Sequence, residues 1–141
     1  MKELDTKTIF LAEGEKHIRE ALHLMLEHQP NFEIAGEADT AESLLAQVCL
    51  QPPDLILLDW NLPGLHPQRL LPALRQYCPE TIILATSVKP EQKKIIQEYK
   101  LDGFVSKQLP PEEFLTTIIK INSIDGDAQK RTHSKNLKSG D

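Results

Sequence analysis

The chain has 141 residues, of which 40% are hydrophobic and 26% charged, and its formal net charge is −5. This length suits one globular domain with its own core, and the acidic balance argues against a nucleic-acid-binding surface over the whole domain. No apolar run approaches the about 20 residues of a membrane span, the charged N-terminus is unlike a signal peptide, and two cysteines are too few for a disulfide scaffold, so we expect a cytoplasmic protein.

Five short apolar runs alternate with helical patterns along the chain. Continuous apolar runs of this length are typical of strands buried on both faces, as in a parallel sheet. The expected strands are 8–12, 32–38, 54–58, 81–85 and 103–106. Between and after them, hydrophobic residues recur with the spacing of one helix face. The expected helices are 15–28, 40–50, 66–77, 90–100 and 111–122.

Local signals refine these helices. Thr40 is a suitable N-cap, and Pro110 with Pro111 is a good helix start. Pro72 should kink its helix or delay the start, because proline has no backbone N–H to donate. Cys49 and Cys78 lie in apolar helical stretches, where we expect both to be buried.

The alternation of strands and helices predicts an α/β fold, doubly wound, with helices on both faces of a parallel sheet. This domain is expected to span residues 1–122. Residues 123–141 lose apolar periodicity, which predicts a flexible tail or the stub of a linker.

Ligands of such sheets bind at the carboxyl ends of the strands, so residues at those ends are the candidates for chemistry. Glu13, Asp59, Thr86 and Lys107 end or follow four of the five strands. A carboxylate can form an acyl phosphate, while an ammonium and a hydroxyl can hold the phosphoryl oxygens. Carboxylates beside such a group could also hold Mg²⁺.

Four stretches resemble the receiver domain of bacterial two-component response regulators, of the chemotaxis-regulator-like kind. They are IFLAEGEKHIRE at 9–20, PDLILLDWNLPG at 53–64, IILATS at 82–87 and DGFVSKQLPPEEF at 102–114. The resemblance implies a flavodoxin-like fold, with five strands in the order 2-1-3-4-5.

The resemblance also implies roles for particular residues. Asp59 would accept a phosphoryl group from a sensor histidine kinase or a phosphotransfer protein. Lys107 and Thr86 would read the acyl phosphate, and Phe104 would change rotamer with Thr86. Glu13, Asp59 and the backbone carbonyl of Asn61 would hold Mg²⁺.

The implied signal leaves through the surface of helix four, strand five and helix five. It would control an output domain or a partner protein. We expect no membrane contact and no direct nucleic-acid binding by this domain. Apart from self-phosphorylation and self-dephosphorylation at Asp59, the chain is not expected to be an enzyme.

Two positions depart from the family pattern. Gly14 replaces an acid that usually binds Mg²⁺ directly, and glycine has no side-chain oxygen to offer. Gln108 follows Lys107 where many relatives have proline, so we expect a trans peptide bond there.

Three functions therefore compete. The chain is a phosphorylatable receiver, or it is a pseudo-receiver that acts as a phosphorylation-independent interaction module because of Gly14. A phosphohydrolase that uses Asp59 as nucleophile ranks last, since Asn61 stands where such enzymes need a second acid.

Overall fold

The computed structural model describes residues 6–121, in which five strands form one parallel sheet in the order β2-β1-β3-β4-β5. The strands are β1 (Lys7–Ala12), β2 (Phe32–Ala38), β3 (Leu55–Asp59), β4 (Ile82–Ser87) and β5 (Gly103–Ser106). The predicted α/β fold and its strand order are confirmed.

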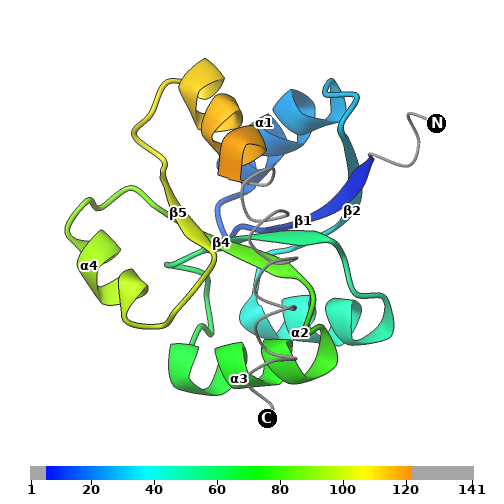
Figure 1. Cartoon of the computed structure of the whole chain (residues 1–141), viewed down its shortest axis with the longest axis vertical. Coiled ribbons are helices and arrows are strands. Elements are labelled where there is room, and N and C mark those ends of the chain that lie inside the picture. The colour runs from blue at the N-terminus through cyan, green and yellow to red at the C-terminus, as the bar shows by residue number, and fades with distance from the viewer. Residues whose placement is uncertain (1–5, 122–141) are drawn as a thin grey trace, which may run out of the picture.

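Helices cover both faces of the sheet (Figure 1). They are α1 (Lys16–Glu27), α2 (Ala41–Leu50), α3 (Pro67–Tyr77), α4 (Gln92–Gln97) and a further helix over residues 111–121. In Figure 1, α1 and helix 111–121 lie on one face, α2 and α3 lie on the other, and α4 lies beside the β5 edge. None of the helices within residues 6–121 has the length and apolarity that a membrane crossing requires.

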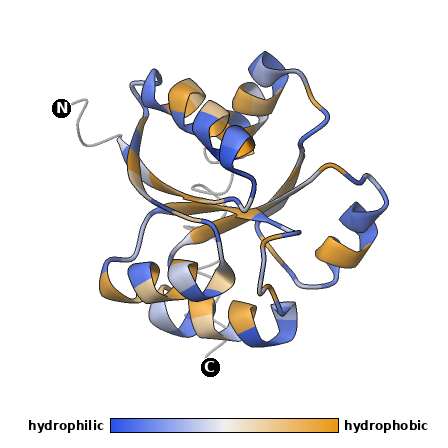
Figure 2. Cartoon of the chain, turned by 180° about the vertical axis from the view of Figure 1, so that it is seen from behind, coloured by the Kyte–Doolittle hydropathy of each residue, from blue (hydrophilic) through white to orange (hydrophobic). Residues whose placement is uncertain are grey.

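The sheet separates two hydrophobic clusters because successive strand side chains point to opposite faces. Ile56, Leu58 and Ile83 pack with α2 and α3, whereas Leu55, Leu57 and Leu84 pack with α1 and helix 111–121. Every residue of β3 and β4 is buried, which explains their unbroken apolar sequence. Figure 2 shows the same pattern, with a largely hydrophobic sheet between helices that carry both hydrophobic and hydrophilic residues.

The structure differs from the helix predictions in two places. α3 begins at Pro67 and runs through Pro72, so its start is not delayed, and the alternative of a kink at Pro72 stays a prediction. Pro72 and Gln68 are both exposed, so water can serve the Gln68 carbonyl that the proline leaves without a helical donor. α4 has six residues rather than the predicted eleven of 90–100, and Lys100 adopts a positive φ of 55° soon after its end.

The prediction for the cysteines was half wrong. Cys78 is buried and its Sγ donates to the Leu74 carbonyl, whereas Cys49 is exposed because it lies on the outer side of α2, next to the buried Val48. All peptide bonds in the described part of the chain are trans, including the one after Lys107. The predicted tail at 123–141 and the end of the domain at 122 lie outside the described residues.

Candidate functional site

Three polar residues lie at the carboxyl ends of adjacent parallel strands. Asp59 ends β3 and stands opposite Thr86 of β4, and Glu13 directly follows β1. All three are buried, with exposed fractions of 4% for Asp59, 2% for Thr86 and 2% for Glu13. The doubly wound topology therefore gathers two carboxyl groups and a hydroxyl at one edge of an otherwise apolar sheet.

Lys107 joins the two acidic side chains. Its Nζ lies 2.5 Å from Glu13 Oε1 and 3.0 Å from Asp59 Oδ1. Its backbone N–H donates to the Ser87 carbonyl at 2.8 Å, which fixes the lysine just after β5. When all three groups are ionised, the ammonium neutralises one of the two carboxylates, and the site keeps one negative charge. An ammonium between two buried carboxylates is a ready partner for an incoming anionic group.

Glu13 has an altered ionisation. Burial raises the pKa of its carboxyl group above the ordinary value, and the neighbouring charge of Asp59 raises it further. The hydrogen bond with Lys107 and the Glu15 N–H act in the opposite direction but do not cancel the effect of burial. Placing two carboxyl groups in one buried space therefore makes the ionised form of Glu13 less favourable.

Arg19 of α1 holds the backbone of Glu13 through a hydrogen bond. Its Nη1 donates to the Glu13 backbone carbonyl at 2.8 Å, and its Nε lies 3.5 Å from Glu37 Oε1. The sequence pattern does not single out Arg19, because an arginine six positions after the acid belongs to no motif of the pocket. We place it as a support of the β1–α1 loop.

The turn after β3 wraps around Asp59. The Asn61 N–H donates to Asp59 Oδ1 at 3.0 Å, and the Leu62 N–H donates to the Asp59 carbonyl at the same distance. Gly64 completes the turn with a φ of +80°, which suits glycine. Trp60 lies against Tyr99, with 5.4 Å between ring centroids, so its indole connects the turn after β3 with the segment after α4.

Glu15 has a different task from Glu13. It is the N-cap of α1, and its Oε2 accepts from the Ile18 N–H at 2.9 Å. Turning this carboxylate toward Asp59 would remove the cap, which typically stabilises a helix by about 1 kcal/mol. The Glu15 side chain therefore serves the start of α1 and takes no part in the pocket.

Gly14 packs against Pro63 in the loop after β3. A Cβ atom on this residue would lie 2.6 Å from Cδ and 3.3 Å from Cγ of Pro63. Distances under about 3 Å force a shift, and the proline ring cannot rotate away. The β1–α1 loop and the β3–α3 loop thus close on each other where a family-typical acid would stand.

The remaining oxygens still fit a magnesium ion. Within residues 6–121 no three acid, histidine or cysteine side chains converge as a metal-binding set. Mg²⁺ is nevertheless commonly bound by one or two carboxylates together with water and phosphate oxygens. Glu13 and Asp59 converge on one cation already, the Lys107 ammonium, and the Asn61 backbone lies beside Asp59.

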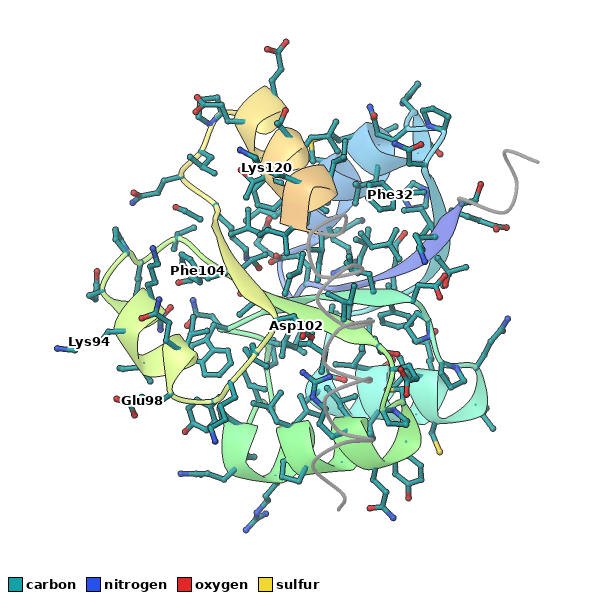
Figure 3. All side chains as sticks on the ribbon, viewed as in Figure 1. Phe32, Lys94, Glu98, Asp102, Phe104 and Lys120 are labelled. Carbon is teal, nitrogen blue, oxygen red and sulfur yellow. The ribbon has the colours of Figure 1, made fainter. Side chains whose placement is uncertain are left out.

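Phe104 stands one strand away from the pocket. It is partly buried and pairs with Ala85 in the sheet, while its neighbour Val105 pairs with Thr86. Figure 3 labels Phe104 on β5, near α4. The structure therefore places it next to the Thr86 position in the sheet, and the predicted change of its rotamer remains a prediction.

Known proteins match this chain over most of its length. The family model of the response regulator receiver domain matches residues 9–119. The nitrate/nitrite response regulator protein NarL of Escherichia coli is 28% identical over 120 residues, which cover 84% of this chain and 56% of that protein. The phosphate regulon transcriptional regulatory protein PhoB of Pseudomonas aeruginosa is 31% identical over 116 residues, which cover 79% of this chain and 50% of that protein. The chain thus spans about half the length of these curated relatives.

Solved structures share the fold. A signal receiver domain from Mycobacterium tuberculosis gives a TM-score of 0.74 at 21% identity and covers 84% of this chain and 98% of that one. A LuxR-family two-component response regulator from Aurantimonas sp. gives 0.74 at 23% identity, over 84% of this chain and 86% of that one. At these identities the likeness concerns the fold.

Proposed function

Since the chain belongs to the response regulator receiver family, we propose that it is a phosphorylatable switch with Asp59 as the phosphoacceptor. The observation that carries the proposal is the contact of Lys107 Nζ with both Asp59 and Glu13. The buried ammonium lies 3.0 Å from the carboxylate oxygen that accepts the Asn61 N–H, so donors surround the proposed nucleophile.

The proposed reaction is a transfer between two covalent carriers. A carboxylate oxygen of Asp59 attacks phosphorus, and the bond between phosphorus and the donor's nitrogen or oxygen breaks. The donor keeps that electron pair and takes a proton from solvent where its chemistry requires one. The new acyl phosphate keeps its anionic oxygens beside Lys107 and Thr86, which supply an ammonium and a hydroxyl.

A magnesium ion is part of the proposal. Glu13, Asp59 and the backbone carbonyl of Asn61 would hold it. Gly14 would add no ligand, because glycine has no side-chain oxygen. When bound, it would neutralise negative charge on the phosphoryl oxygens. The Glu13 carboxylate contacts Lys107 Nζ, and burial, together with the charge of Asp59, raises the pKa of Glu13.

The product of the reaction is a changed surface. A receiver with two conformations signals when the phosphoryl group favours one of them. A sensor histidine kinase or a phosphotransfer protein would supply the group. Helix α4, strand β5 and helix 111–121 would present the signal to an output domain or a partner. We also propose that the protein is cytoplasmic. Its catalysis would be limited to forming and hydrolysing its own acyl phosphate.

Intact mass after exposure to acetyl phosphate tests the proposal. With Mg²⁺ present, the protein should gain one phosphoryl mass, and Trp60 emission should change because the indole follows the acceptor residue. Asp59→Asn should abolish both signals. Asp39→Asn removes the same charge at an exposed position and should leave them intact.

One observation favours the pseudo-receiver as the second candidate. The contact of Gly14 with Pro63 closes the place of a usual metal ligand. If millimolar Mg²⁺ and acetyl phosphate yield no adduct on the wild-type protein, the phosphorylatable switch is wrong. The fold would then act as a phosphorylation-independent interaction module.

A further inference from the structure

A fully buried hydroxyl ends β4. Ser87 has an exposed fraction of 0%, so its side chain needs hydrogen-bond partners inside the protein. Its Oγ accepts from the Lys89 N–H at 2.9 Å and donates to the side-chain oxygen Oε1 of Gln92. The Ser87 carbonyl also accepts from Lys107 N–H, so Ser87 lies directly behind the pocket.

The other end of the same Gln92 side chain faces the acceptor loop. Its Nε2 lies 3.5 Å from Oδ1 of Asn61, whose backbone N–H donates to the Asp59 carboxylate. One carboxamide therefore spans from the end of β4 to the turn after β3. Only Asn61 stands between Asp59 and Gln92, the first residue of α4, in this chain of polar contacts.

α4 has few other attachments. It is six residues long, and Ile96 is its one buried residue. Figure 3 shows Lys94 and Glu98 pointing away from the molecule on its outer side. Beyond the helix, Tyr99 packs on Trp60. With so little buried apolar surface, the polar contacts of Gln92 become a large share of what holds the first turn.

We propose that Gln92 is a positioning residue that latches the first turn of α4 to Ser87 and Asn61 in the unphosphorylated protein. A carboxamide has a fixed length, so it meets both partners only at their resting separation. Asn61 and the Thr86–Ser87 end of β4 both border the Asp59 carboxylate, so a phosphoryl group bound between them would change their separation. Release of the latch by phosphorylation rests on the proposed function; the resting latch does not.

Amide hydrogen exchange of the segment 88–100 tests the resting latch in the unmodified protein. Gln92→Ala should speed exchange of this segment roughly 3- to 10-fold, as expected for the loss of about one net hydrogen bond. Gln92→Met keeps the aliphatic length without the polar end and should act in the same way. Gln97→Ala, an exposed residue at the other end of α4, should change exchange by less than about 2-fold.

The outcomes separate cleanly. Wild-type exchange in Gln92→Met would overturn the latch, because packing alone would then hold the helix. Equal effects of Gln92→Ala and Gln97→Ala would overturn it as well.

A second comparison tests release. After acetyl phosphate and Mg²⁺, the wild-type segment 88–100 should exchange faster, whereas Gln92→Ala should gain little more because its latch is already absent. An equal gain in both proteins would overturn release through Gln92. If intact mass shows no adduct, the proposed function fails, and exchange in the unmodified variants still decides the latch.

Discussion

Gly14 occupies its position because of space and not because of backbone torsion. Among the glycines of residues 6–121, only Gly64 has a positive φ. At Gly14 the obstacle is the Pro63 ring, 2.6 Å from the place of a Cβ. Any side chain at position 14 would meet this ring, so the effects of substitutions at Gly14 and Pro63 should depend on each other.

A double-mutant cycle tests this pair. Gly14→Ala should destabilise the protein by about 1–3 kcal/mol, as overpacking usually does. Pro63→Ala removes the ring that a Cβ would meet, so the double variant should be more stable than the sum of the single changes predicts. Urea unfolding of the four proteins measures the coupling. Additivity within about 0.5 kcal/mol would show that the two positions are independent.

The residues of the pocket differ in how well sequence predicts them. Asp59 and Glu13 end or follow buried apolar strands, and the carboxyl ends of parallel strands meet, so their convergence follows from the pattern. Arg19 and Gln92 reach the site from half-buried positions of α1 and α4 that belong to no motif. Their contacts depend on side-chain direction in three dimensions, which neither periodicity nor motif specifies.

At the scale of the element, burial on both faces explains why the strands were predictable. β3 and β4 are buried throughout, and their predicted bounds differ from the observed ones by one or two residues. α4 was predicted poorly because its sequence gives a weak stripe. Ile95 is 52% exposed, while its neighbour Ile96 is buried. An edge helix with one buried residue has no full amphipathic period to recognise.

The N-cap of α2 was predicted correctly, and its strength can be measured. Thr40 Oγ1 accepts from the Ser43 N–H at 3.1 Å. Thr40→Ala should lower the free energy of unfolding by about 1 kcal/mol, because one N–H at the helix start loses its partner. Thr116 is a matched control, since its hydroxyl donates to the Glu112 carbonyl inside helix 111–121 and caps no free N–H. An equal loss in Thr116→Ala, by chemical denaturation, would contradict a special role for the cap.

At the scale of the whole molecule, the fold places an acidic site at the edge of an apolar sheet. The sheet order brings β1 and β3 together, and with them Glu13 and Asp59. Lys107 arrives from β5, two strands away, and compensates one of the two charges. Folding therefore assembles a site that favours a proton or another cation, and the stability of the domain must depend on pH.

The sign of that dependence follows from Glu13. Burial and Asp59 raise its pKa above the ordinary 4.5, so the folded protein holds the proton more tightly than the unfolded chain. This contribution to the free energy of unfolding is complete below 4.5 and is lost as the pH rises through the folded pKa. In chelator-treated buffer, the stability of the wild type relative to Glu13→Gln should therefore fall with rising pH. Glu20→Gln, at an exposed position of α1, should run parallel to the wild type. A relative stability that rises with pH would mean that Lys107 outweighs burial and holds Glu13 ionised.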